Sequence, residues 1–143
     1  MILATLESKK DDQNDKIKIA EKLDQLYLQL IDLYLTIEKP AEAESVIQLL
    51  ESRLTMNSSE DDYAFGIMNE MANTLRKHNN LELSNEYYKK ALLCIKRRYK
   101  TDFKKQLSTS KVLINIATVH YLLENAPEAI KYYNHSIEVL NLI

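Results

Sequence analysis

Small and apolar residues in three stretches of the chain recur at spacings of four and then three residues, which places them on one face of a helix. The second stretch begins 41 residues after the first, and the third begins 45 residues after the second. The positions they share are Ala43, Ile47 and Leu50, then Ser84, Tyr88 and Ala91, then Ala129, Tyr133 and Ser136. The pattern therefore predicts an internal repeat that contains an amphipathic helix.

A second amphipathic stretch precedes each of these helices. Twelve residues before the first shared position stand Ile31, Ala72 and Ala117, with Leu30, Met71 and Ile116 directly before them and Tyr34, Leu75 and His120 three residues after. A short segment joins the two stretches, reading TIEKP, KHNN and LENAP in the three copies. Proline at a helix start costs no hydrogen bond, and asparagine suits a turn or a cap. Each copy is therefore predicted to be a helix, a tight turn and a second helix.

The copies divide a single domain of residues 1–143 into repeats at 20–54, 63–99 and 106–143. Thr5–Lys9 (TLESK) echoes Leu49–Arg53 (LLESR), so residues 1–10 are predicted to be a remnant helix of a preceding repeat. The last helix runs to Ile143 with no polar capping helix after it. Because stacked repeats bury each face against a neighbour, this favours a piece of a longer array, or an array that continues through self-association. The alternative is that the final apolar residues fold back locally.

The three copies resemble the tetratricopeptide repeat. The resemblance covers roughly residues 20–143 and rests on QLIDLYLTIEKPAEAESVIQLL, NEMANTLRKHNNLELSNEYYKKAL and NIATVHYLLENAPEAIKYYNHSI. Glu38, Asn79 and Glu124 stand where the family usually has a turn glycine. The spacings exceed the family's usual period of about 34 residues and are similar to those of kinesin light chain and the G-protein-signalling modulator proteins. The resemblance implies an all-α, right-handed α–α superhelix (solenoid) of three helix-turn-helix repeats.

The resemblance also implies a binding surface, because the first helix of each repeat in this family lines a concave groove. The groove positions best suited to contact a ligand are Asn69, Asn73, Arg76, Lys77, Lys111, Thr118 and Tyr121. Those of the first repeat are Gln25, Leu28, Asp32, Leu35 and Thr36. An asparagine amide offers a donor and an acceptor to an extended peptide, and the three cations favour an acidic or phosphorylated ligand.

The chaperone-binding subset of the family grips a C-terminal carboxylate with a clamp of Lys and Asn side chains. Lys111 matches one clamp position, but Leu28, Asp32, Glu70 and Asn115 stand at the others. The sequence therefore does not predict capture of chaperone tails.

Composition supports the helical prediction. The chain has one glycine and two prolines, which leaves little material for hairpin turns, and 45% of its residues are hydrophobic. A single cysteine, Cys94, excludes an intrachain disulfide and a cysteine-based metal cluster. No stretch approaches the roughly 18 apolar residues of a membrane span, and the first residues lack the basic segment of a signal peptide. We therefore expect a cytoplasmic protein without membrane insertion.

Charge is unevenly distributed along the chain. The net charge is −2, yet residues 1–75 carry 15 acidic and 7 basic side chains, whereas residues 76–143 carry 6 acidic and 12 basic. Either the charges are scattered over solvated faces, or regions of opposite sign steer a charged partner or a second copy of the chain. The segment KRRYKTDFKK (96–105) places six cations around Tyr99 and Phe103. We do not expect nucleic acid there, because the chain is acidic overall and the cations suit a helix C-terminus.

No catalytic arrangement is evident in the sequence. His78, His120 and His135 occupy three different positions in the repeats, and His120 takes the slot of Tyr34 and Leu75, which predicts a packed position between helices. There is no glycine-rich phosphate loop and no HExxH helix. We therefore expect neither an enzyme nor a bound cofactor or metal.

The segment NSSEDD leaves two interpretations open. Ser58 and Ser59 each stand three residues before an aspartate. This arrangement fits a helix N-cap with acidic residues in the first turn, or an acid-directed phosphorylation site.

The predicted function is that of a non-catalytic scaffold, which binds a peptide or protein segment in the groove. One alternative is a structural module that assembles through its terminal repeats. Another is a regulatory domain that responds to a peptide.

Overall fold

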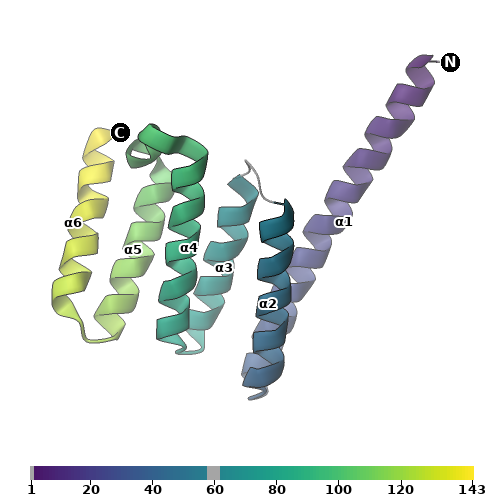
Figure 1. Cartoon of the computed structure of the whole chain (residues 1–143). Coiled ribbons are helices and arrows are strands. Elements are labelled where there is room, and N and C mark those ends of the chain that lie inside the picture. The colour runs from purple at the N-terminus through teal and green to yellow at the C-terminus, as the bar shows by residue number, and fades with distance from the viewer. Residues whose placement is uncertain (1, 58–61) are drawn as a thin grey trace. The chain divides into compact units, whose positions relative to one another are not determined.

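The computed structural model describes the backbone of residues 2–57 and 62–143 and the side chains of residues 11–55, 63–104 and 106–143. This part of the chain forms six α-helices and a short 3₁₀ helix, with no β-strand (Figure 1). They are α1 (Ile2–Thr36), α2 (Pro40–Asn57), α3 (Asp62–Lys77), α4 (Leu81–Tyr99), η1 (Lys100–Lys105), α5 (Leu107–Leu122) and α6 (Ala126–Leu142). The predicted all-helical class is confirmed. None of the described helices combines the length and apolar character needed to cross a bilayer.

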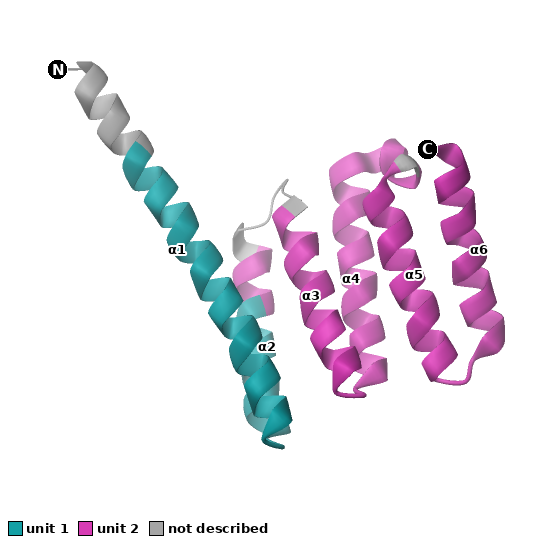
Figure 2. Cartoon of the chain, turned by 180° about the vertical axis from the view of Figure 1, so that it is seen from behind, with its two compact units in different colours: residues 1–50 teal, residues 51–143 magenta. Residues whose placement is uncertain are grey.

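The chain divides into two compact units, residues 1–50 and residues 51–143 (Figure 2). The first unit holds α1 and most of α2, and the second holds the remaining helices. Within the second unit α3 packs against α4, α4 against α5 and α5 against α6, so consecutive helices lie side by side (Figure 1). The 3₁₀ helix η1 contacts α4, α5 and α6. The second unit therefore contains two helix pairs, joined through α4 and α5.

The N-terminal helix differs from the sequence prediction. A separate helix is expected at residues 1–10, whereas α1 runs without a break from Ile2 to Thr36. The segment between the expected helices, KDDQNDKIKIA at residues 10–20, contains neither glycine nor proline. Because nothing in it ends a helix, the two predicted helices become one.

The three turns between paired helices share one geometry. In each turn a backbone N–H bonds to the carbonyl five residues earlier at 2.8 Å, and the residue before the donor is left-handed. The donor and acceptor residues are Lys39 and Tyr34, Asn80 and Leu75, and Asn125 and His120. The left-handed residues are Glu38 (φ 61°), Asn79 (φ 63°) and Glu124 (φ 61°). This is the Schellman motif, which usually has glycine at the left-handed position, so the chain repeats the geometry without the glycine.

Small residues at the shared positions allow paired helices to approach closely. The first shared position is buried in all three copies, as Ala43, Ser84 and Ala129. The Ser84 hydroxyl donates to the carbonyl of Ala72 at 2.7 Å, which joins α4 to α3. The hydroxyls of Ser110 and Ser136 lie 2.7 Å apart and join α5 to α6. Each buried hydroxyl therefore has a partner, and such a bond contributes about 1 kcal/mol to stability.

Hydrogen bonds of Glu51 join the last turns of α2 to α4 within the second unit. Its carboxylate accepts hydrogen bonds from Tyr87 Oη at 2.7 Å and from Lys90 Nζ at 2.5 Å. Partial burial by itself raises the pKa of Glu51, but the bonds from Lys90 and Tyr87 and the charge of Lys90 outweigh burial. The pKa therefore lies below the ordinary value of 4.5, and the carboxylate stays charged at neutral pH.

Candidate functional site

Polar residues predicted for the groove form a hydrogen-bonded network between α3 and α5. Asn115 stands at its centre, because its Nδ2 donates to Asn69 Oδ1 at 3.1 Å and its Oδ1 accepts from the Arg76 guanidinium at 3.5 Å. All three side chains are half-buried. The sequence marks Asn115 only as a departure from the carboxylate clamp, so its role in holding Asn69 and Arg76 was missed.

Asn73 and Arg76 are also tied to α4. The Tyr88 hydroxyl donates to Asn73 Oδ1, and the Arg76 guanidinium lies 5.8 Å from the centre of the Tyr88 ring. Burial raises the pKa of Tyr88, and the positive charge of Arg76 opposes that shift only in part. The phenol therefore stays protonated and remains a donor, and Asn73 and Arg76 have fixed positions on α3.

Of the remaining predicted groove residues of the second unit, all but the half-buried Thr118 are exposed. Lys77 and Lys111 are exposed, and the side chain of Tyr121, near the end of α5, is 68% exposed. The Thr118 hydroxyl lies 3.2 Å from the Tyr133 hydroxyl of α6. The surface formed by α3 and α5, here called the α3/α5 face, thus combines fixed amides with exposed cations.

In the first unit the side chains at the expected groove positions differ in their exposure to solvent. Gln25 and Thr36 are exposed, Asp32 and Leu35 are half-buried, and Leu28 is buried. The Thr36 hydroxyl bonds to the Asp32 carbonyl at 2.7 Å, within its own helix. Leu28 is therefore a core residue and not part of an accessible surface.

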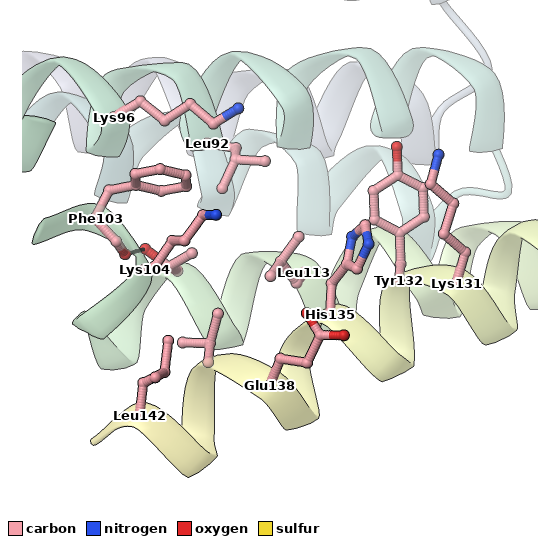
Figure 3. A pocket seen from close by; sticks show the side chains of 12 residues that line it. Leu92, Lys96, Phe103, Lys104, Leu113, Lys131, Tyr132, His135, Glu138 and Leu142 are labelled. Carbon is pink, nitrogen blue, oxygen red and sulfur yellow. Dashed lines mark hydrogen bonds between the residues drawn. The ribbon is translucent and has the colours of Figure 1, made fainter. Parts of the chain in front are cut away.

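A pocket of about 460 Å³ lies between α4, η1, α5 and α6 (Figure 3). Its size falls within the range of about 300–1,000 Å³ typical of ligand sites. Its apolar lining includes Leu92, Phe103, Leu113, Tyr132 and Val139. Its polar lining includes Lys96, Lys104, Lys131, His135 and Glu138. The charged side chains of this α4/α6 pocket are thus mainly cations.

The basic segment at residues 96–105 shapes one side of the α4/α6 pocket. The Thr109 hydroxyl donates to the Phe103 carbonyl at 2.5 Å, which fixes η1 against α5. Lys96 Nζ then lies 5.2 Å from the centre of the Phe103 ring, and on the opposite side Lys131 Nζ lies 5.5 Å from that of Tyr132. Each end of the pocket therefore pairs an aromatic ring with an ammonium group (Figure 3).

His120 packs against Tyr132, one of the residues that line this pocket. The two rings are stacked, with centroids 5.5 Å apart and an interplanar angle of 4°, and His135 meets Tyr132 edge-on at 6.0 Å. Both ring nitrogens of His120 are buried, and no hydrogen-bond partner is found for them among the described residues. Burial lowers the pKa of His120, Glu128 opposes this, and Lys89 and Lys131 lower it further. The ring is therefore neutral at physiological pH and acts as a packed side chain.

Three further residues are singled out by the sequence. Ser58 and Ser59 lie outside the described residues. Cys94 is half-buried on α4, where burial raises the pKa of its thiol and Arg97 opposes the shift. Because the thiol is protonated at neutral pH, it is a poor nucleophile.

Comparison with known proteins gives a likeness of fold. No family model and no curated protein sequence matches the chain. Among solved structures, BtubC (BKLC) from P. vanneervenii is similar, with a TM-score of 0.65 and 19% sequence identity. The match covers 93% of this chain and 51% of that chain, so this chain spans about half the length of BtubC. At this identity the likeness concerns the fold alone.

Proposed function

We propose that this chain is a non-catalytic protein-interaction module, built as a right-handed solenoid of tetratricopeptide-like repeats, that binds an acidic segment of a partner protein. One turn geometry recurs at Glu38, Asn79 and Glu124, the positions that the repeat register predicts, and this supports the repeat assignment. The observation that carries the binding proposal is the α4/α6 pocket, where three lysines and several apolar side chains line one cavity.

The lining of the pocket favours one kind of ligand. Lys96, Lys104 and Lys131 outnumber the single acid, Glu138, so a carboxylate or phosphate is attracted to the rim. Exposed ion pairs contribute little individually, which means that affinity also needs apolar burial. The apolar side chains that line the pocket, among them Phe103 and Leu113, supply a surface for it. The ligand we propose is an extended segment in which an acidic residue stands beside an apolar one.

The α3/α5 face is the second candidate for the same activity. The bonds of Asn115 to Asn69 and Arg76 hold these polar groups in place before a ligand arrives. Preformed groups lose little conformational entropy on binding, which favours recognition of an extended backbone. Exposed Lys77 and Lys111 add positive charge to this face.

A peptide array distinguishes the two surfaces. It would carry peptides that combine Asp or Glu with Leu or Phe, each beside a copy with Lys in place of the acids. We expect the chain to bind the acidic peptides, with affinity falling as salt is added. Lys96→Glu with Lys131→Glu should abolish binding, whereas Lys77→Glu with Lys111→Glu should leave it unchanged.

A matched control removes the same charge elsewhere. Lys39→Glu with Lys89→Glu changes two exposed lysines that do not line the α4/α6 pocket. This variant should bind as the wild type does. If the lysine copies of the peptides bind as well as the acidic ones, the proposal of an acidic ligand is wrong. If only the Lys77 and Lys111 variant loses binding, the α3/α5 face is the site.

A further inference from the structure

One side of α6 carries an apolar stripe that is exposed to solvent. Its residues follow each other at spacings of three, four and three, and they are Ile130, Tyr133, Ile137 and Leu140. The repeat register pairs this stripe with one on α4, which packs against α5. There Tyr88 and Ile95, the counterparts of Tyr133 and Leu140, are fully buried. The counterparts of Ile130 and Ile137 are Asn85 and Leu92, and both are half-buried. The α6 stripe thus corresponds to a face that α4 covers in large part inside the molecule.

One side of α1 carries a second exposed apolar stripe. Its residues follow each other at spacings of four and three, and they are Ile19, Leu23, Leu26, Leu30 and Leu33. All of them are exposed except Leu30, which is half-buried. The positions of α5 that correspond to the last four are Thr109, Val112, Ile116 and Val119, and all four are buried. The α1 stripe is thus the repeat face that α5 buries.

The two stripes correspond to faces of α4 and α5, two helices that pack against each other within the chain. We propose that two copies of this chain associate head to tail, with the α1 stripe of one copy on the α6 stripe of the next. In this arrangement α1 takes the place beside α6 that α5 takes beside α4. The surface shares no residue with the lining of the α4/α6 pocket, and it borders the α3/α5 face where Tyr133 meets Thr118.

The match between the two stripes favours a second copy as the occupant. The chain packs α4 against α5, and the α6 and α1 stripes are the counterparts of faces on those two helices. A contact between two α1 stripes or between two α6 stripes has no such precedent in the fold.

The proposed contact joins two different surfaces, so it is heterologous. Each copy that uses its α6 stripe still has a free α1 stripe, and assembly continues unless the rotation between copies closes a ring. The average mass of the wild-type chain should therefore rise with its concentration above 16.7 kDa, the mass of one copy.

Sedimentation velocity on two surface variants tests the pairing. Leu26→Asp places a charge in the α1 stripe and Ile137→Asp places one in the α6 stripe, and both positions are more than half exposed, at 60% and 54%. Each variant alone should remain at the mass of one copy at every concentration. An equimolar mixture should form a species of twice that mass and nothing larger, because it retains one intact α1 stripe and one intact α6 stripe per pair.

Two control variants place a charge beside the stripes and not within them. Gln25→Asp and Asn134→Asp add the same charge at exposed positions beside the stripes, and they should associate as the wild type does. A second pair, Leu33→Asp and Leu140→Asp, repeats the test if circular dichroism shows that either first variant has lost helix. A wild type that stays at the mass of one copy overturns the proposal. So does a Leu26→Asp variant that still associates, or a mixture that does not.

Discussion

The helices α4 and α6 present the same pattern of side chains and differ in what covers them. Tyr88 and Ile95 on α4 are fully buried, whereas Tyr133 and Leu140, at the same register positions of α6, are 37% and 46% exposed. Tyrosine corresponds to tyrosine and isoleucine to leucine, so side-chain chemistry does not cause the difference. The cause is the neighbour, because α4 packs between α3 and α5 within the second unit.

The apolar stripe of a helix is therefore half of an interface. Such a stripe is largely buried on α4, which packs against both α3 and α5, and is exposed on α6, which packs against α5. The stability of the second unit should therefore depend strongly on the α4 positions and weakly on their α6 counterparts, as long as the chain is dilute.

The largest predicted difference concerns aliphatic truncation. Ile95→Ala removes a fully buried side chain and should lower the free energy of unfolding by about 3 kcal/mol. Leu140→Ala removes a side chain that is nearly half exposed and should cost less than about 1 kcal/mol. Urea unfolding followed by circular dichroism at low protein concentration measures both. Equal costs would mean that Leu140 is covered in the free chain.

Substitutions of the corresponding tyrosines, Tyr88 and Tyr133, should differ less in their effect on the free energy of unfolding. Tyr88→Phe leaves Asn73 without its buried donor and should cost about 1–2 kcal/mol. Tyr133→Phe loses only an exposed contact with Thr118 at 3.2 Å and should change stability by under about 0.5 kcal/mol. The same urea experiment applies. If Tyr133→Phe is the costlier change, the hydroxyl on α6 has a structural role that burial does not reveal.

Substitutions in the turns that follow α3 and α5 should differ less in their effect on stability, and here the substitutions stabilise the chain. Glu124 holds a left-handed conformation that glycine adopts without strain, so Glu124→Gly should stabilise the chain by about 1 kcal/mol. Asparagine tolerates that conformation better, and Asn79→Gly should gain only about 0.3 kcal/mol. Thermal unfolding of both variants beside Glu124→Ala, which keeps the strain, checks this. A Glu124→Ala variant as stable as Glu124→Gly would exclude backbone strain as the cause.

The smallest effect is a dependence on pH confined to the third repeat. Burial keeps the pKa of His120 below its ordinary value of 6.5, so the folded chain binds fewer protons than the unfolded chain. Stability should be full above pH 6.5 and fall as the pH decreases below it. His120→Leu, which copies Leu75 of the second repeat, should remove this loss.

Unfolding free energies measured between pH 7.5 and pH 5.5 would show the effect of His120. This window lies above 4.5, the ordinary pKa of the Glu51 carboxyl, which is lower still in the folded chain, so that group does not contribute. A His120→Leu variant that loses as much stability as the wild type over this range would show that another group titrates.

Local features of the fold could be predicted from the sequence. The register of small and apolar residues located the paired helices, because helical periodicity is encoded within each segment. The structure places left-handed residues at Glu38, Asn79 and Glu124, where the repeat register expects a turn glycine. The break expected after residue 10 was wrong, since an echo of TLESK in a later copy says nothing about whether a helix ends there.

The contacts within the candidate surfaces could not be predicted in the same way, because they join residues of different helices. Asn115 holds Asn69 only because α3 and α5 approach each other, and no local pattern in either helix marks that bond. The α6 side of the pocket does have a signal, since Tyr132, His135 and Val139 recur at spacings of three and four. The contributions of α4 and η1 to the pocket become visible only in the folded chain.

The claim that the α6 stripe of one copy packs on the α1 stripe of the next is tested most directly by hydrogen exchange, measured by mass spectrometry at low and high protein concentration. One experiment gives the exchange rates of the amides in both α4 and α6. We predict that amides of α6 and of residues 19–33 in α1 exchange more slowly at high concentration, while those of α4 do not change. Exchange that is the same at both concentrations in every segment, or slowing confined to α3 and α5, would contradict it.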